Sequence, residues 1–369
     1  MAKIKAFLKK EIVFSIAALV ALASMFLCPP SLEYIDYLDL ATLELLFCLM
    51  CAVAGLRNAG VMDRLAHTLI VRARSGKALA LALVALCFFS AMLITNDVAL
   101  ITFVPLTIAV FGAEDKRRLI VTVVMETVAA NLGSMATPIG NPQNIFLYSY
   151  YSLSAGEFFT IILPFAGLCL LLTALTAALF RYGAPRQADT GTAPAVNVRD
   201  TVVYAVLFLV CVLTVLKLIS SHICFAAVLL IVLVYNRRIL LRVDYFLLLT
   251  FVCFFVFVGN ISSVEAVQRA VSAALGGREL LVSALASQVI SNVPAAVMLA
   301  SFTENAKELL LGVNIGGLGT PVASLASLIA YKQYCACDDP DRGAFFRIFL
   351  AVNFALLIIL LAAAYLFFV

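Results

Sequence analysis

Uninterrupted apolar runs recur along the whole chain, and they restrict its fold more than any other feature. Each run of about 20 residues is long enough to cross a bilayer core of roughly 30 Å as a helix. Hydrophobic residues make up 64% of the 369 positions and charged residues only 12%, whereas a water-exposed surface must be largely polar. Continuous rather than alternating runs exclude a transmembrane β-barrel. We therefore predict an all-α polytopic membrane protein.

Two segments interrupt the apolar runs with one shared pattern of glycine, proline and amide residues. Residues 131–148 align without a gap with residues 314–331. The identical pairs are Asn131 with Asn314, Gly133 with Gly316, Thr137 with Thr320, Pro138 with Pro321 and Tyr148 with Tyr331. Glycine and proline interrupt helices, and interrupted segments at corresponding positions are typical of transporters built from repeats. We predict two broken spanning helices that belong to an internal repeat.

Two other apolar stretches, residues 78–112 and 279–303, are each divided by a polar tip. The tips read Thr95-Asn96-Asp97 and Ser291-Asn292-Val293-Pro294. The arms of the first stretch, about 15–17 residues each, are short for a full crossing. We predict two re-entrant hairpins, whose irregular tips are tolerable at membrane depth only beside protein or a water-filled cavity.

Charge placement orients the predicted elements. The basic amino terminus is expected in the cytoplasm of a multi-pass inner (plasma) membrane protein, and the carboxyl terminus outside. The first repeat, 1–181, contains spans 12–28, 40–56 and 157–180, hairpin 78–112 and broken span 119–150. Residues 182–199 form a cytoplasmic linker. The second repeat, 200–369, contains an extra span 200–219 that inverts it, further spans 223–235, 243–259 and 345–369, hairpin 279–303 and broken span 307–334. Residues 57–77 and 261–278 are predicted as interfacial helices.

A transport site is expected where the hairpin tips and helix breaks meet. Helix N-termini at a break attract anions, exposed carbonyls attract Na⁺, and amides and hydroxyls complete coordination without a buried net charge. Close packing alone would explain the glycines, but not the recurrence of Thr-Pro and Asn at matched positions. The predicted site residues are Thr95, Asn96, Asp97, Asn131, Gly133, Thr137, Pro138, Gly140, Asn141, Ser291, Asn292, Val293, Asn314, Gly316, Thr320 and Pro321.

Two carboxylates are candidates for coupling transport to an ion gradient. A carboxylate at membrane depth is costly and typically lines an ion or proton path, which makes Asp97 the first candidate. The alternative for Asp97 is a helix cap for the second hairpin arm. Glu126 is the second candidate, and for it a structural hydrogen bond is an equal alternative.

The segments 131–144 and 291–294 resemble the ion transporter superfamily, which includes citrate transporters, divalent-anion/sodium symporters, arsenite permeases and some sodium/proton antiporters. The resemblance covers roughly residue 40 to the end. It implies a homodimer with an elevator mechanism and a site lined by Thr95, Asn96, Thr137, Ser291, Asn292 and Thr320. The first tip reads Thr-Asn-Asp where the symporter pattern is Ser-Asn-Thr, which leaves H⁺ and Na⁺ both open as the coupling ion.

The leading hypothesis is therefore a secondary active transporter for a small anion, either a carboxylate or an inorganic oxyanion. Arsenite or antimonite efflux and Na⁺/H⁺ exchange are the alternatives. Only two histidines are present, which disfavours an intramembrane enzyme, and no P-loop surrounds Ser75-Gly76-Lys77. The expected partners are the lipid bilayer and the anion, not nucleic acid. We expect no cofactor besides a transported or coupling Na⁺, and no metal site, although Cys335 and Cys337 form a CxC pair.

Overall fold

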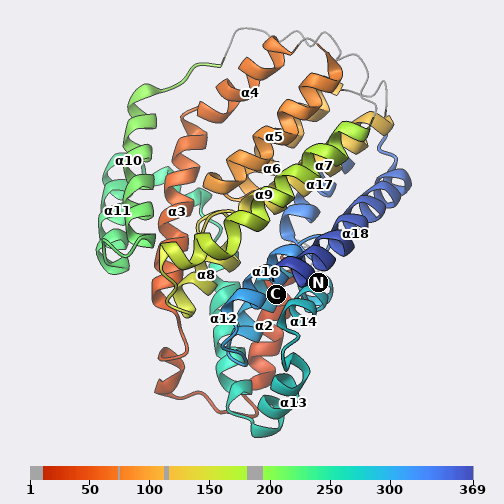
Figure 1. The fold of residues 1–369 in the computed structure, drawn as a ribbon. Helices are drawn as coiled ribbons and strands as arrows, with labels where there is room; N and C mark the ends of the chain where they lie inside the picture. The colour runs from red at the N-terminus through yellow and green to blue at the C-terminus, as the bar shows by residue number, and fades with distance from the viewer. Residues whose placement is uncertain (1–10, 74, 112–115, 181–193, 369) are drawn as a thin grey trace.

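A computed structural model describes residues 11–73, 75–111, 116–180 and 194–368 (Figure 1). The regular structure of these residues is helical, with no strand among them. The predicted basic amino terminus and most of the predicted linker 182–199 lie outside the described residues.

Seven described helices are long and apolar enough to cross a membrane. They are α3 (Leu40–Asn58), α5 (Gly76–Ile94), α9 (Ala155–Leu179), α10 (Val198–Val215), α11 (Ser221–Asn236) continued by the 3-10 helix η2 (Arg237–Arg242), α12 (Tyr245–Ser262) and α18 (Arg342–Phe367). The all-α polytopic architecture is thus confirmed. The inversion of one repeat relative to the other stays a prediction.

Both predicted hairpins contain two helices that meet at a single residue. The first consists of α5 and α6 (Asn96–Phe111), which meet at Thr95. The second consists of α14 (Glu279–Ile290) and α15 (Asn292–Ala300), which meet at Ser291. The predicted arm length was wrong for α5: because Ser75 caps its first turn, the helix begins at Gly76 and reaches 19 residues, enough for a crossing by length.

Both predicted broken helices are interrupted within the aligned segments. The first consists of α7 (Lys116–Ser134) and α8 (Pro142–Tyr150), and the second of α16 (Ala306–Ile315) and α17 (Leu325–Cys335). The sequence explains the restart of α8, because Pro142 occupies its first turn and Asn141 Oδ1 accepts a hydrogen bond from Asn144 N at 2.9 Å. Proline and asparagine are both favourable at these positions of a helix.

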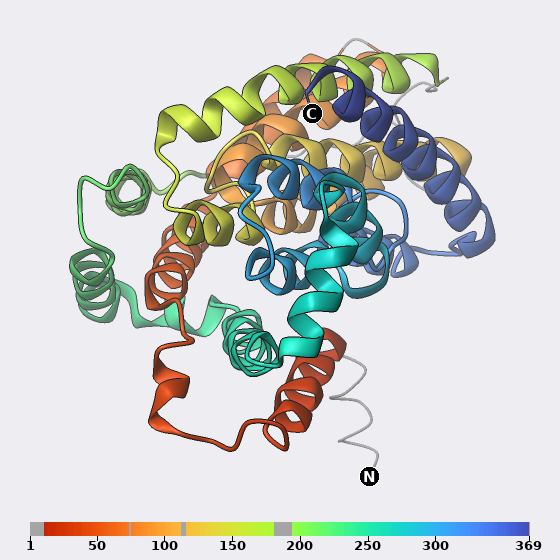
Figure 2. The same ribbon diagram turned by 60° about the horizontal axis from the view of Figure 1, so that its bottom comes forward.

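Three shorter elements lie outside these pairs. Helices α4 (Val61–Arg72) and α13 (Glu265–Leu275) occupy the segments predicted as interfacial. Helix α2 (Ile12–Ser24) is shorter than the predicted span 12–28, and after it comes the 3-10 helix η1 (Leu32–Ile35). Figure 2 shows α2 beside α12, where Asn260 Nδ2 donates to Ser24 Oγ at 3.0 Å.

The helices form two groups that meet around α8. Helix α3 packs against α10 and α11 at one side of the molecule (Figure 1). Helix α7 lies in the other group, surrounded by α5, α6, α9 and α18, and every residue from Leu119 to Ser134 is buried. A helix buried on all faces belongs to the interior of a bundle. Helix α8 contacts α3 on one side and α15 and α16 of the second hairpin and second broken helix on the other, so the breaks lie close to the boundary between α3 and these elements.

Candidate functional site

The two hairpin tips have the same backbone conformation. Thr95 has φ 70° and ψ 153°, and Ser291 has φ 75° and ψ 153°. Each is followed by an asparagine whose side-chain oxygen accepts a hydrogen bond from the next backbone N–H, 2.9 Å away. Left-handed backbone is uncommon for threonine and serine. Its occurrence at both tips therefore marks a matched local structure, not a chance irregularity.

A threonine from each break attaches the neighbouring hairpin at a matched position. Thr137 Oγ1 donates to Met92 O at 2.5 Å, and Thr320 Oγ1 donates to Gln288 O at 2.9 Å. Both acceptors lie three residues before the tip. The threonines that recur in the sequence thus fix the hairpin ends relative to the breaks.

A glycine from each broken helix allows its hairpin to approach closely. A Cβ atom on Gly133 would lie 2.2 Å from the backbone oxygen of Phe88, and one on Gly316 would lie 2.8 Å from the Cα of Ala284. Phe88 and Ala284 each lie eight residues before the tip asparagine. Any larger residue would force the helices apart, which explains why glycine recurs at this position.

The asparagine before each break is bonded by residues of the opposite half. Asn131 Oδ1 accepts from Ser324 Oγ at 2.9 Å, and Asn131 Nδ2 donates to Ser327 Oγ at 3.3 Å. Asn314 Oδ1 accepts from Asn141 Nδ2 at 2.9 Å, and Asn314 Nδ2 donates to Asn144 Oδ1 at 2.7 Å.

These contacts are reciprocal. In the ungapped alignment, Asn141 corresponds to Ser324 and Asn144 to Ser327. Each half therefore offers its asparagine to the helix that restarts in the other half. Contacts exchanged in this way are expected of two units related by a two-fold axis.

The first tip is tied directly to this centre. Asn96 Nδ2 donates to Asn131 Oδ1 at 3.1 Å, so the tip of the first hairpin, the first break and the second break share one hydrogen-bonded group. At the second tip, Asn292 N donates to Ala323 O at 2.9 Å, and the Asn292 amide nitrogen would lie 2.9 Å from a Cβ on Gly317.

Most of the sequence-predicted residues are therefore gathered around the contact between the halves. Those in the hydrogen-bonded and packed arrangement are Asn96, Asn131, Gly133, Thr137, Asn141, Ser291, Asn292, Asn314, Gly316 and Thr320. Gly140 packs against Ser134 O within the first break, Val293 is buried, and Pro321 is partly exposed beside Thr320. Thr95, Asp97 and Pro138 line cavities.

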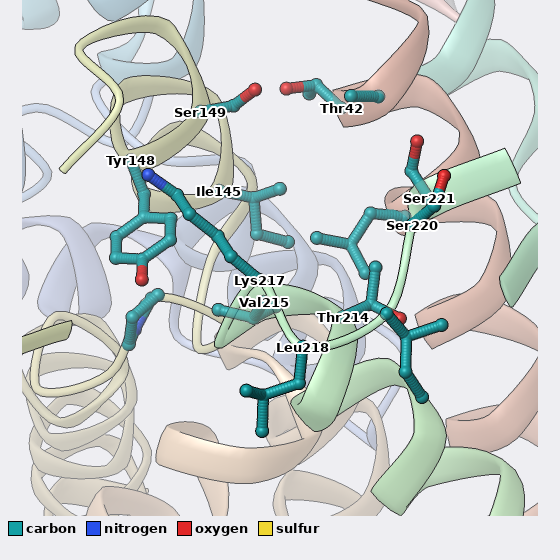
Figure 3. Close-up of a pocket in the computed structure, with 14 residues that line it drawn as sticks. Thr42, Ile145, Tyr148, Ser149, Thr214, Val215, Lys217, Leu218, Ser220 and Ser221 are labelled. Carbon is teal, nitrogen blue, oxygen red and sulfur yellow. The ribbon is translucent and has the colours of Figure 1, made fainter. Parts of the chain in front are cut away.

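Two of the cavities beside α3 contain residues of the predicted site. The outer cavity, about 420 Å³, is lined by Pro138 among other residues. Figure 3 shows Tyr148 and Lys217 in its lining. The inner cavity, about 290 Å³, contains Thr95 and Asp97 of the first tip. We name them outer and inner after the predicted topology. Each has the size of a small-molecule site.

A comparison with known proteins identifies the family. Residues 5–309 match the sequence profile of the citrate transporter family. The chain belongs to this family. It is 32% identical over 307 residues to an uncharacterized transporter of Methanocaldococcus jannaschii, covering 82% of this chain and 83% of the relative. It is also 32% identical over 302 residues, 80% of each chain, to the inner membrane protein YbiR of Escherichia coli.

A more distant relative matches a part of the chain. A silicon efflux transporter of Oryza sativa is 34% identical over 129 residues, which is 34% of this chain and 26% of the relative. The resemblance to the ion transporter superfamily is thereby confirmed. The chain is a multi-pass membrane transporter of the citrate type, and its activity is transport, not enzymatic catalysis.

The two carboxylates of this citrate-family transporter have different surroundings. Asp97 lies in the first turn of α6, where Asp97 N donates to Asn96 Oδ1, and the partly buried Asp97 side chain lines the inner cavity. Glu126 is fully buried on α7 and does not line the inner cavity. Glu126 Oε1 accepts from Thr107 Oγ1 at 2.5 Å, which is the structural hydrogen bond weighed as its alternative.

Sequence reasoning missed several residues of this arrangement. Asn144, Ser324 and Ser327 lie inside the aligned segments. The alignment pairs Asn144 with Ser327 and Asn141 with Ser324. Gln288 Nε2 donates to Gly316 O and Leu318 O, both at 2.9 Å. The sequence feature that could have identified Gln288 is a single amide side chain within an otherwise apolar hairpin arm. Arg57, at the end of α3, was assigned only to topology, yet it lines the inner cavity.

The cysteines are free and show no metal centre. No group of three His, Cys, Asp or Glu residues is placed to hold a metal ion in the part of the chain that the structure describes. Burial raises the pKa of the Cys337 thiol, which lies in a loop and belongs to the CxC pair. A raised pKa favours the thiol over the thiolate that binds soft metals.

Proposed function

We propose that the protein is a secondary active transporter of a small anion, a carboxylate or an inorganic oxyanion, driven by an H⁺ or Na⁺ gradient. The reciprocal bonding of Asn131 and Asn314 carries this proposal. It joins both helix breaks, while Asn96 and Asn292 extend from the hairpin tips to the same region. Interrupted helices at a repeat interface are the usual construction of a transporter's ion and substrate site.

Asp97 is the proposed coupling residue. It is the carboxylate of the first tip, and it lines the inner cavity together with Asp244, Arg57 and Arg242. Proton or Na⁺ binding there offsets the cost of a carboxylate at membrane depth. Glu126 is the weaker candidate because it does not line this cavity.

Elevator-type alternating access fits the grouping of the helices. The hairpins and breaks bond with one another through Thr137 and Thr320, so they are able to move as a unit. Helices α3, α10 and α11 supply the opposing wall, and Gly55 of α3 lies directly against the Tyr204 ring of α10. We propose that the hairpins and broken helices move together along the wall formed by α3, α10 and α11, within a homodimer.

The proposed location is the plasma membrane, with the amino terminus in the cytoplasm and the carboxyl terminus outside. Accessibility of single introduced cysteines to an impermeant thiol reagent, in a cysteine-free background, tests this orientation. Labelling from outside at the amino terminus would overturn it.

Uptake into proteoliposomes tests the proposed function. Purified protein is reconstituted, and radiolabelled citrate, succinate, sulfate and phosphate are offered with an inward H⁺ or Na⁺ gradient. We expect accumulation of at least one anion that collapses when the gradient is dissipated, and loss of this accumulation in Asn96→Ala/Asn292→Ala. If the anion only equilibrates to the same concentration inside and outside the proteoliposomes, and does so without an ion gradient, secondary active transport would be contradicted.

Metalloid efflux is the second candidate, because the chain shares a 129-residue match with a silicon efflux transporter. Uptake of arsenite or antimonite into everted vesicles separates this candidate from anion uptake, because efflux from the cell corresponds to uptake into everted vesicles. Na⁺/H⁺ exchange without any anion is the third. It predicts Na⁺-induced alkalinisation of acid-loaded proteoliposomes when no permeant anion is present.

A further inference from the structure

The inner cavity combines apolar walls with two arginines. Its walls include α3 from Leu46 to Val53, Ile94 beside the first tip, and Ile145 of α8. Arg57 enters the lining from the end of α3, and Arg242 enters it from the end of η2. Neither arginine was predicted as a site residue. The cavity therefore has positively charged groups, which the hairpin tips alone do not supply.

The two guanidinium groups have no hydrogen-bonded acid. Within the described ranges neither guanidinium donates a hydrogen bond to another residue, and both line the same cavity. Asp63 is the acidic neighbour of Arg57, and it is exposed on α4. A guanidinium offers five donors in a fixed fork that matches a carboxylate or sulfonate. An anion between two like charges relieves their repulsion and satisfies these donors.

The acids of the cavity interact with each other. Asp97 and Asp244 are electrostatic neighbours, and Asp244 Oδ1 also accepts from Leu247 N at 2.9 Å to cap α12. The lining of the cavity thus contains two arginines and two carboxylates. It offers groups of opposite charge to an anion and to a coupling cation.

We propose that Arg57 and Arg242 form a loading site for a singly charged organic anion, whose apolar body lies against α3 and the first hairpin. This inference rests on the proposed function and names its substrate class. Apolar walls favour a ligand that buries hydrocarbon surface. A trivalent anion such as citrate would lose the hydration of charges that the walls cannot satisfy.

The second cavity supports a path along α3 for the same kind of ligand. In the outer cavity, Lys217 Nζ lies 5.5 Å from the centre of the Tyr148 ring. Figure 3 shows Ile145 in the outer cavity between Tyr148 and Ser220. Ile145 also lines the inner cavity, and α3 lines both. A cationic residue thus lies in each cavity, with an apolar side chain at their boundary.

Calorimetric titration of the purified full-length protein tests the loading site. The probes are hexanesulfonate and methanesulfonate, which share a headgroup and differ only in the apolar body, together with sulfate and citrate. We expect hexanesulfonate to bind at least about tenfold more tightly than methanesulfonate, because it buries additional methylene groups. Citrate and sulfate are expected to bind more weakly than hexanesulfonate.

Substitutions then assign the binding to the two arginines. Arg57→Gln/Arg242→Gln is expected to weaken hexanesulfonate binding by about ten- to a hundredfold, the loss typical of charged hydrogen bonds. Arg238→Gln is the matched control, since Arg238 is exposed on the same 3-10 helix and does not line the cavity. If the double variant is misfolded by gel filtration, Arg242→Gln alone replaces it, because this arginine is exposed at the end of η2.

The outcomes separate this inference from the proposed function. Gradient-driven transport of citrate or sulfate, with equal binding of hexanesulfonate to the wild type and the arginine variants, would overturn the loading site and leave the transporter intact. Arginine-dependent binding of hexanesulfonate without any gradient-driven flux would keep the loading site and overturn secondary active transport. Tighter binding of citrate than of hexanesulfonate would overturn the substrate class.

Discussion

The two hairpin tips share a backbone and differ in charge. Thr95 and Ser291 have φ angles within a few degrees of each other, 70° and 75°, and each following asparagine bonds the next N–H in the same way. The residue after that asparagine is Asp97 in the first tip and Val293 in the second, where the side chain is 7% exposed. The comparison teaches that backbone geometry is common to both halves, whereas the carboxylate proposed for coupling belongs to the first half alone.

The largest effects are expected from the matched glycines. Gly133→Leu and Gly316→Leu should each destabilise the protein by about 3 kcal/mol, the upper end for overpacked interiors, because a Cβ there meets the backbone of a hairpin. Thermal unfolding of the purified variants, followed by circular dichroism, measures the loss. Gly167→Leu is the control, since no atom lies within 4 Å of a Cβ at that position. Tolerance of one glycine variant but not the other would break the equivalence of the halves.

Asp97→Asn should abolish gradient-driven accumulation, with at least about a tenfold loss, because an amide cannot take up the coupling charge. Exchange of labelled for unlabelled anion should persist. Glu157→Gln, which removes a carboxylate from an exposed capping box on α9 and leaves a residue type that such boxes accept, serves as the control. Unchanged accumulation in Asp97→Asn would refute the coupling role.

Moving the carboxylate sharpens the same comparison. Asp97→Val with Val293→Asp keeps the number of charges but places the acid where the side chain does not line the inner cavity. Accumulation should stay absent in this double variant. Recovery of coupling would mean that either tip can hold the coupling charge.

The reciprocal asparagines should show intermediate and similar effects. Asn131→Ala removes the partner of the Asn96 amide nitrogen and of the Ser324 and Ser327 hydroxyls. Asn314→Ala removes the donor to Asn144 Oδ1 and one of the two acceptors of Asn141 Nδ2. We expect a loss of about 1–3 kcal/mol in each case, the cost of unsatisfied buried polar groups. Chemical denaturation in detergent provides the measurement. A loss in only one variant would argue against a two-fold arrangement of the contacts.

The smallest effects are expected from the two threonines, and they should differ. Thr137→Val removes the bond to Met92 O and should cost about 1 kcal/mol. Thr320→Val should cost less, because Gln288 still accepts from Thr320 N at 2.8 Å and bonds Gly316 O and Leu318 O. The loss of local stability in each variant is measured by hydrogen exchange of the backbone amides of the hairpin. In a Gln288→Met background, which mimics Met92, the two losses should become equal.

The sequence predicted the structure well where residue type itself interrupts a helix, as glycine and proline do. Gly133, Pro142 and the paired Thr-Pro segments predicted the helix breaks, and the amides Asn96 and Asn292 predicted the tips. The length of α5 was mispredicted because its start depends on the Ser75 cap rather than on apolar periodicity.

The rest depends on contacts between distant segments. That Asn131 bonds Ser324 and not Asn141 follows from how the halves dock, which no local pattern specifies. Arg57 and Arg242 are remote in sequence and are basic residues of the type that also orients spans, so charge counting alone gave them no role in a cavity.

A cryo-EM structure of the nanodisc-reconstituted protein with a transported anion bound tests the central claim most directly. The account predicts density for the anion in contact with both hairpin tips, within hydrogen-bonding distance of the Asn96 and Asn292 segments. Density remote from both tips, or hairpin tips separated from each other and from the two breaks, would contradict it.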